Sequence, residues 1–442
     1  MIAVTGAGVV SAIGLNKAES LDALRSGRSG IGKVRWLRTD HTEFPVGEVP
    51  ASNDELKRLL GITHEPTTRS QLLGVMAARE ALHQAFPPED PNLAQNSQNS
   101  QKKLSTLNSQ LSTLKEVALI SGTTVGGMDA FEEHYPQMLM GEGGWYYLMS
   151  HDCGACTRMI ADALFSPEDQ DLAQNSQNSQ KELLTPNSSL LTQKLVATPS
   201  TACSSALNAI ILGCRMLESG RVDVVIAGGT ECLTRFHLNG FKSLMILDER
   251  PCRPFDKERA GLNLGEGAGY LVLEREEDAL ARSAKVLAKI SGCGNACDAF
   301  HQTATSANGD GALRAMTQAL NQAGLQPSDI DYVNAHGTGT PNNDASESAA
   351  LRSLFADRMP AVSSTKALTG HATSASGGIE AVFCLMAMQE GFIPPQPNFT
   401  QADPACIVPQ TEPAQAHLRH VLCNSFGFGG NDSAIILSTP NS

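Results

Sequence analysis

The chain has 442 residues, of which 41% are hydrophobic and 18% charged, with 39 glycines. This composition is typical of a packed α/β enzyme of two or three domain-sized units and argues against a disordered chain. The formal net charge is −13 and no Lys/Arg run is present, which argues against nucleic acid as a partner.

The N-terminal segment MIAVTGAGVVSAIG predicts a first strand followed by a glycine turn, on the evidence of Val4, Gly6, Gly8 and Val9. It lacks the basic region of a signal peptide, and no segment reaches 18 uninterrupted apolar residues, so we expect no membrane span. We expect a cytoplasmic protein whose eleven cysteines are reduced thiols.

Two low-complexity segments stand apart from the rest of the chain. Residues 93–102 and 172–181 share the sequence LAQNSQNSQK, and 14 of the 23 residues from 93 to 115 are Gln, Asn, Ser or Thr. Such segments bury too little apolar surface to offset the entropy of ordering. We interpret 88–115 and 166–194 as surface insertions, flexible or marginally helical, that serve either as tolerated linkers or as partner-docking loops.

The remaining sequence alternates strand-like and helix-like runs, which predicts a layered α/β fold with sheets covered by helices on both sides. The apolar run VDVVIAGG at 222–229 predicts a strand buried on both faces. Residues 204–217, apolar nearly all round, predict a buried helix. Further strands are expected at 117–120, 195–197, 268–274, 330–333 and 434–438, and further helices at 311–323 and 345–356.

Cys153 and Cys156 have CxxC spacing next to His151. A lone CxxC without a second pair is weak evidence for zinc or redox chemistry. We therefore interpret both as small residues at the start of a helix and expect no metal site.

Reactive side chains gather among small residues in three places. Cys203, in TACSSA, precedes the buried helix, where backbone amides and the helix dipole favour a thiolate. His336, in NAHGTGT, follows a strand and is accompanied by the hydroxyls of Thr338 and Thr340. His371 closes SSTKALTGH.

Two other features accompany these motifs. Lys366 lies five residues before His371, and the following small-residue helix carries Glu380. The loop NSFGFGGN, which contains Phe428, offers backbone amides suited to an oxyanion hole. One cysteine, two histidines and an amide-rich loop are the equipment of thioester chemistry, in which the thiolate accepts an acyl group and neutral imidazoles stabilise an enolate.

In this order, TACSSA, NAHGTGT, SSTKALTGH and NSFGFGG resemble the elongating β-ketoacyl-acyl carrier protein synthases. The resemblance extends to RPFDKERAGLNLGEGAG and TGAGVVSAIG and covers the whole chain except the two insertions. It implies a thiolase fold, in which two similar α/β halves form a five-layered αβαβα core, here residues 1–284 and 285–442. It also implies a homodimer and an acyl carrier protein as partner.

The resemblance further implies decarboxylative Claisen condensation, with Cys203 holding the acyl group. His336 and His371 would bind the malonyl thioester, while Lys366 and Glu380 would order the site. Phe428, on a mobile gating loop, would complete an oxyanion hole with the Cys203 amide. The residues expected to contact substrate are Thr338 and Thr340 on the phosphopantetheine arm, and Val125 and Phe241 on the acyl chain. The resemblance also implies that the enzyme binds no cofactor of its own, because phosphopantetheine arrives on the carrier.

Four departures from the family pattern concern the substrate. Residues 259–262 read RAGL where RDGF is usual, and Asn431-Asp432 replaces the usual Thr-Asn. The region 143–163 and the short SLMILDERPCRPFD segment look more like relatives from polyketide and aryl-polyene pathways. Fatty-acid elongation and polyketide or aryl-polyene elongation therefore both stay open.

Three alternative functions remain. A silent chain-length-factor-like partner in a heterodimer would lack the nucleophile, which this chain keeps. A thiolase would need a second reactive cysteine, for which Cys423 is the candidate, although its surroundings fit the synthase motif better. A starter-type synthase would carry one His and one Asn, where this chain has two histidines.

Overall fold

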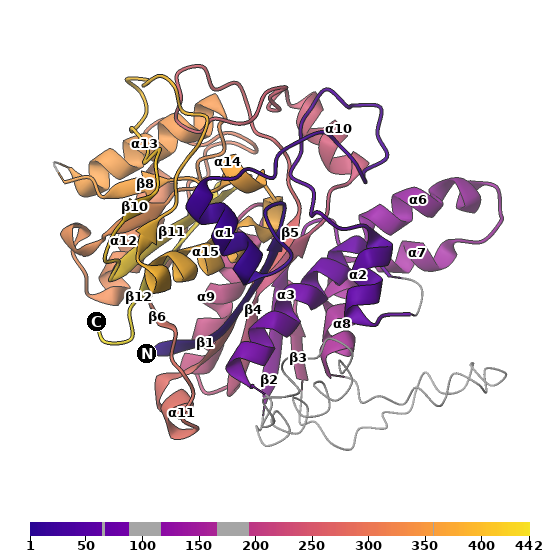
Figure 1. The fold of residues 1–442 in the computed structure, drawn as a ribbon, viewed down its shortest axis with the longest axis horizontal. Helices are drawn as coiled ribbons and strands as arrows, with labels where there is room; N and C mark the ends of the chain where they lie inside the picture. Colours follow the sequence, from indigo (N-terminus) through magenta and orange to yellow (C-terminus); the bar gives the residue numbers. More distant parts are fainter. Residues whose placement is uncertain (64–66, 88–115, 166–193, 357) are drawn as a thin grey trace.

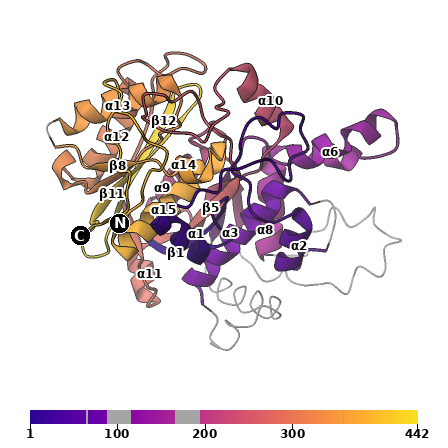
Figure 2. The ribbon, with the colours of Figure 1, turned by 45° about the horizontal axis from the view of Figure 1, so that its top comes forward.

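The computed structural model describes residues 1–63, 67–87, 116–165, 194–356 and 358–442. The two predicted insertions lie outside the described residues, except for Lys194, which begins a strand. In the views of Figures 1 and 2, the two chain termini lie near each other, and helix α6 projects from the body of the molecule.

Ten strands form one continuous sheet that contains the same strand order twice. The first five-strand set is β3 (Lys194–Ala197), β2 (Val117–Gly122), β4 (Val224–Glu231), β5 (Gly267–Arg275) and β1 (Ile2–Ser11). The second set, from the opposite edge, is β8 (Ala361–Ser363), β7 (Tyr332–Asn334), β11 (His420–Gly427), β12 (Asn431–Ser438) and β6 (Ala288–Cys297). Numbered within each set, both orders are 3-2-4-5-1.

The two sets meet where β1 pairs antiparallel with β6, over Ile2–Val4 and Ala288–Ile290. In each set, the strands in positions 3, 2 and 4 are parallel and the last two pairings are antiparallel. The predicted domain division at residue 285 stays a prediction. A two-strand sheet of β9 (Phe392–Ile393) and β10 (Ala414–Gln415) lies apart.

Helices cover the strand sets in three layers (Figure 1). The central layer, α9 (Ser205–Glu218) and α15 (Ser376–Glu390), packs against strands of both sets. Outside the first set lie α3 (Arg69–Ala85) and α8 (Cys153–Phe165), and outside the second lie α12 (Asp310–Ala323) and α13 (Pro341–Phe355). The order α, β, α, β, α is the predicted five-layered core. The remaining helices are α1 (Lys17–Ser26), α2 (Asn53–Leu60), α6 (Met128–Leu139), α7 (Trp145–Ser150), α10 (Arg235–Ser243), α11 (Glu276–Ala281), α14 (Lys366–Thr369) and the 3-10 turns η3 (Pro327–Asp329) and η4 (Thr373–Ala375).

The all-round apolar sequence of α9 has a simple cause. This helix lies between the two strand sets, so nearly its whole circumference is buried, and its residues join both sets in one core cluster. A helix covered on both sides has no polar face. The prediction of a buried helix at 204–217 is confirmed, with ends shifted by one residue.

Two local predictions need correction. Residues 6–8 do not form a turn, because β1 continues through Gly6 and Gly8 to Ser11. These glycines are needed for close packing: a Cβ on either would collide with backbone carbonyl oxygens of α3, those of Ala81 and Ala77 respectively. The helix predicted at 345–356 begins earlier, at Pro341. Proline suits the first turn of a helix, because a backbone N–H there has no hydrogen-bond partner within the helix.

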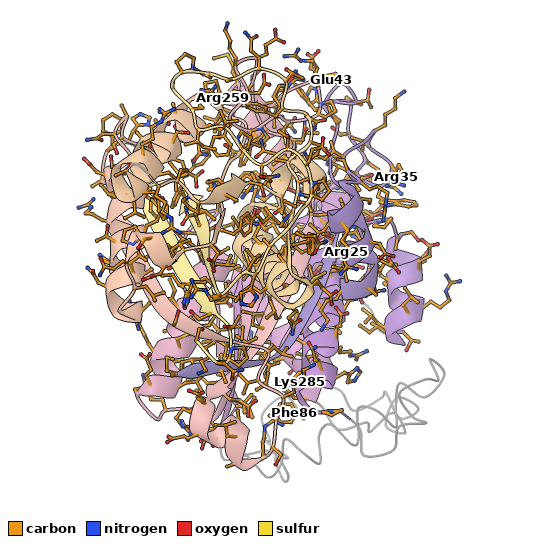
Figure 3. The ribbon with its side chains drawn as sticks, turned by 60° about the vertical axis from the view of Figure 1, so that its left-hand side comes forward. Arg25, Arg35, Glu43, Phe86, Arg259 and Lys285 are labelled. Carbon is orange, nitrogen blue, oxygen red and sulfur yellow. The ribbon has the colours of Figure 1, made fainter. Side chains whose placement is uncertain are left out.

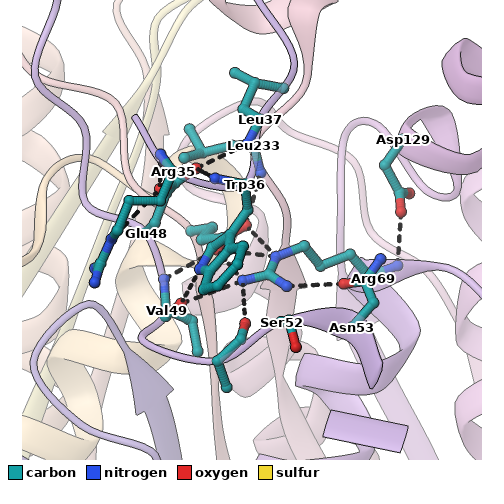
Figure 4. Close-up of polar contacts among 12 residues, drawn as sticks. Arg35, Trp36, Leu37, Glu48, Val49, Ser52, Asn53, Arg69, Asp129 and Leu233 are labelled. Carbon is teal, nitrogen blue, oxygen red and sulfur yellow. Dashed lines mark hydrogen bonds and ion pairs between the residues drawn. The ribbon is translucent and has the colours of Figure 1, made fainter. Parts of the chain in front are cut away.

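A buried ion pair fixes the segment that leads into β5. The Arg69 guanidinium, at the start of α3, lies 2.6 Å from the Glu266 carboxylate and also donates to the carbonyl oxygens of Val49 and Ala51. Figure 4 shows Arg69 in this network, between Val49 and Asn53. Leu264, two residues before Glu266, pairs with the backbone of His371. The network therefore anchors the segment that holds His371.

Candidate active site

A cavity of about 310 Å³ brings together most of the predicted site residues. It opens beside the carboxyl ends of the parallel strands, where the loops after β7 and β11 approach the start of α9. The predicted residues that line it are Cys203, Phe241, His336, Thr338, Thr340, His371 and Phe428.

Cys203 lies on a tight turn immediately before α9. The turn is strained, because Ala202 has a φ of 53°, a region that residues with a side chain seldom adopt. The Cys203 sulfur is 3.1 Å from Nε2 of His371, and the carbonyl of Cys203 accepts a hydrogen bond of 2.9 Å from Ser425. The turn thus aims the thiol at a histidine and at the cavity.

Burial raises the pKa of the Cys203 thiol to about 12, while the positive charge of Lys366 and a hydrogen bond from the Phe428 amide lower it. Desolvation therefore outweighs the helix terminus that the sequence suggested as the main influence. The resting group is a thiol, and its deprotonation depends on the adjacent imidazole of His371.

His371 is oriented from both sides of its ring. Nδ1 lies 2.9 Å from the Ser376 hydroxyl, which leaves Nε2 for Cys203. The His371 backbone donates to Asn263 and accepts from Gly265, so the loop is pinned to the segment anchored by Arg69. Ser376 begins α15, and its hydroxyl therefore ties the histidine to the central helix layer.

His336 stands almost perpendicular to His371, with ring centroids 5.3 Å apart. Glu347 of α13 holds its loop by accepting the backbone amides of His336 and Gly337, both at 2.8 Å. Burial raises the pKa of Glu347 to about 7. Within the described part of the chain, Nδ1 of His336 has no hydrogen-bond partner. The ring is held by its backbone and is available to a ligand.

The imidazoles of His336 and His371 are both neutral in this buried cavity. Burial lowers the pKa of His336 and of His371 well below the usual value, and the charge of Lys366 adds to this effect. A neutral imidazole can donate one hydrogen bond and accept another. Such a pair suits a substrate that develops negative charge on oxygen.

Lys366 and Glu380 form a buried ion pair of 2.5 Å that links α14 to α15. Their side chains are 1% and 3% exposed, and burial raises the pKa of Glu380 to about 7. Neither residue lines the cavity, so both act on the site through its electrostatics and its framework.

Four of the remaining predicted residues line the cavity, and one does not. Thr338 and Thr340 lie side by side, with their hydroxyls 2.8 Å apart. Phe241 and Phe428 stack with ring centroids 5.8 Å apart. Val125, in contrast, does not line this cavity and lies in the core beneath α3 and α8, so its expected influence on chain length stays a prediction.

Comparison with known proteins agrees with this arrangement. Residues 195–279 match the family model "Beta-ketoacyl synthase, N-terminal domain", and 287–400 match "Beta-ketoacyl synthase, C-terminal domain". Nodulation protein E of Rhizobium meliloti is 32% identical over 98% of both chains. The 3-oxoacyl-[acyl-carrier-protein] synthase 2 of Synechocystis is also 32% identical, over 98% of this chain and 96% of its own.

This chain belongs to the β-ketoacyl synthase family. The family consists of acyltransferase-type condensing enzymes, as predicted. Among solved structures, the ishigamide ketosynthase/chain length factor has a TM-score of 0.82 at 32% identity, covering 99% of this chain and 98% of that one. A ketosynthase (ApeO) from Xenorhabdus doucetiae, in complex with its chain length factor, has a TM-score of 0.75 at 29% identity with the same coverage. The predicted thiolase fold is confirmed.

Sequence reasoning missed three buried groups of this synthase. Glu347 and Ser376 hold the two histidine loops, as described above. Glu231, at the end of β4, accepts hydrogen bonds from Thr123, from Thr124 and from Ser374. A carboxylate at the end of an otherwise apolar strand was a signal for Glu231, whereas nothing in the sequence ties Glu347 or Ser376 to a particular histidine.

None of the other ten cysteines lines the cavity that contains Cys203. Cys153 and Cys156 begin α8, which confirms their interpretation as helix-start residues. Cys423 is buried in β11 against Cys384 and does not line the cavity, so the structure offers no second cysteine at the site of the kind a thiolase needs. In the described ranges, no three His, Cys, Asp or Glu side chains gather as metal ligands, and no helix could cross a bilayer.

Proposed function

We propose that this synthase extends acyl chains by decarboxylative Claisen condensation, with an acyl group held on Cys203 and malonyl-carrier protein as the second substrate. The observation that carries the proposal is the contact of 3.1 Å between the Cys203 sulfur and Nε2 of His371, with His336 perpendicular beside it in one cavity. The family relation supports the reaction type.

In the first step, the Cys203 sulfur attacks the acyl thioester, and its proton passes to Nε2 of His371. The bond to the carrier thiolate then breaks, and the carrier leaves with that proton. The negative oxygen of the intermediate would be held by the amides of Cys203 and Phe428. The Phe428 amide already faces the sulfur in the resting enzyme.

In the second step, neutral His371 has exchanged to the tautomer with its proton on Nε2, and Nδ1 accepts from the Ser376 hydroxyl. The malonyl thioester carbonyl then accepts hydrogen bonds from His336 and His371. The carboxylate leaves as CO₂, and its bonding electrons form an enolate that the two neutral imidazoles stabilise. The enolate carbon attacks the carbonyl of acyl-Cys203, and the sulfur is released as the leaving group. The product is a 3-oxoacyl thioester on the carrier, and one proton from solvent restores the thiol.

The proposal includes acyl carrier protein as a partner and no enzyme-bound cofactor, since the phosphopantetheine arm comes with the carrier. Thr338 and Thr340, with adjacent hydroxyls on the cavity wall, would hold that arm. Arg259 braces this wall, because it lies 2.6 Å from Asp403 and donates to the Pro341 carbonyl. Figure 3 shows Arg259 near the top of the molecule in that view. The leucine at 262, where the family motif usually has phenylalanine, also lines the cavity.

We also propose that the chain works as a dimer, either with a second copy or with a related subunit. The solved structures of a ketosynthase with its chain length factor favour a related subunit as one option. In either pairing, this chain would be the catalytic member, because its cysteine and both histidines line one cavity. The relatives of this chain are consistent with elongation either of fatty acids or of polyketides and aryl polyenes. We place this reaction in the cytoplasm.

Intact-mass spectrometry tests the proposal directly. The protein is incubated with saturated, polyunsaturated and aryl-primed acyl-carrier thioesters, and the mass of the protein is measured. We expect a mass increase equal to one acyl group, absent in Cys203→Ala, while that variant still releases CO₂ from malonyl-carrier protein. Condensation by Cys203→Ala would overturn the assignment of the nucleophile.

A further inference from the structure

His237 is a buried imidazole that the proposed chemistry does not use. It lies in the first turn of α10, with a side chain only 9% exposed. Its Nε2 is 3.7 Å from the Glu231 carboxylate, which is too far for a hydrogen bond. No other described residue hydrogen-bonds to its ring nitrogens. The ring nitrogens therefore keep their hydrogen-bonding capacity for another group.

Its position connects it to the reactive thiol. The His237 ring meets the edge of Phe241 at a centroid distance of 5.9 Å, and Phe241 stacks on Phe428 at 5.8 Å. Phe428 and Cys203 line the same cavity, and the Phe428 amide lowers the pKa of the Cys203 thiol. The imidazole therefore lies directly behind the aromatic wall of the cavity that an acyl group on Cys203 would enter.

Glu231 cannot move to satisfy this imidazole. Thr123 and Thr124 on one side and Ser374 on the other all donate to its carboxylate. Ser374 lies three residues after His371, so displacement of Glu231 would also disturb the catalytic loop. Burial lowers the pKa of His237, although Glu231 opposes this, which leaves a neutral ring that can donate or accept one hydrogen bond.

We propose that His237 forms a hydrogen-bonding subsite for the distal part of the acyl group, and that the synthase selects acyl chains bearing a hydroxyl there over alkyl chains of equal length. This rests on the proposed function, because the acyl group must first reach Cys203. A hydroxyl can donate to or accept from the unpartnered nitrogen, whereas an alkyl chain buries it unsatisfied. Rotation of Phe241 and Phe428 out of their stack would open the path between the two.

The test is a competition between paired acyl-carrier thioesters. Each pair has the same chain length and ends in either a hydroxyl or a methyl group, and several lengths are compared. Intact-mass spectrometry gives the ratio of the two acyl groups on Cys203. At the length that reaches His237, we expect a preference of roughly two- to tenfold for the hydroxylated chain, which corresponds to one net hydrogen bond.

Three variants separate hydrogen bonding from packing. His237→Phe keeps the ring contact with Phe241 but has no nitrogen, so the ratio should fall to about one. His237→Gln restores a donor and an acceptor and should recover part of the preference. His417→Phe makes the same substitution at an exposed site and should behave like the parent protein.

Each outcome decides one question. A ratio of one at every length in the parent protein, or an unchanged preference in His237→Phe, would overturn the subsite. If His237→Phe does not fold, His237→Leu is the replacement, and the parent ratio still decides. Absence of any mass increase that depends on Cys203, with every thioester, would instead refute the proposed function.

Discussion

Lys366 has two roles, one in an ion pair and one in the electrostatics of the site. Its ammonium group is paired with Glu380, and its charge helps to keep His336 and His371 neutral. Because it is nearly fully buried, its field is poorly screened by water. The residue thus contributes to catalysis without lining the cavity.

We predict that Lys366→Met raises the pKa of both imidazoles, because one cause of their depression is removed while burial remains. More imidazolium then forms at low pH, so the acidic limb of CO₂ release from malonyl-carrier protein should move upward by about one pH unit. The measurement is a pH profile from 5 to 9. Lys366→Met combined with Glu380→Gln avoids leaving a lone buried carboxylate. The exposed Arg215→Met should leave the profile in place.

Asp432 is a buried carboxyl group in the departure Asn431-Asp432. It is 2% exposed, and its Oδ1 has no hydrogen-bond partner among the described residues. Burial raises its pKa to about 8, with help from Asp298 and Glu347. The folded protein therefore keeps a proton that the unfolded chain loses near pH 4, and stability falls as the pH rises from about 4 to about 8.

Asp432→Asn should remove this pH dependence, because the amide has the same shape and carries no charge. We expect a gain of roughly 1–3 kcal/mol in the free energy of unfolding near pH 8, and little or no gain near pH 4. Chemical denaturation at both pH values measures it. An equal change at both would show that packing, rather than ionisation, governs the position.

At the scale of elements, β1 and α3 illustrate how closely the first strand set and its outer helix approach. Gly8 of β1 faces the Ala77 carbonyl of α3, with no room for a Cβ. We predict that Gly8→Ala forces the helix away from the sheet and costs roughly 1–3 kcal/mol or more of stability. Gly32→Ala is the matched control, since a Cβ there meets nothing within 4 Å. Comparable melting temperatures in both variants would contradict the packing argument.

The elements differ in how far the sequence could predict them. Strands and helices buried on all sides, such as β4 and α9, were predicted to within two residues, because burial leaves an apolar run. Gly6 and Gly8 were misassigned to a turn, since sequence alone does not distinguish a glycine needed for a bend from one needed for close approach. Cys203 and His371 could be predicted from motifs, whereas the position of His237 behind Phe241 depends on which loops meet in space.

For the whole molecule, two features of the surface call for a partner. Strand β3 is an edge of the ten-strand sheet, and an unprotected edge can pair with another chain. Helices α6 and α7, with Met140 directly after α6, carry several large apolar side chains that are 45–71% exposed: Tyr135, Leu139, Met140, Trp145, Leu148 and Met149. Such a cluster is unusual for a monomer and typical of an interface.

We predict that the synthase alone sediments as a dimer at low micromolar concentration. Met149→Glu places a charge where the interface would exclude water, so this variant should shift toward monomer by roughly tenfold or more in Kd. Val408→Glu, at an equally exposed apolar residue of the second half, should leave the dimer intact. Sedimentation velocity gives both populations. A monomeric parent protein would indicate that α6 and α7 bind a different subunit. Co-expression with a related ketosynthase-type chain should then give a heterodimer, and Met149→Glu should weaken it.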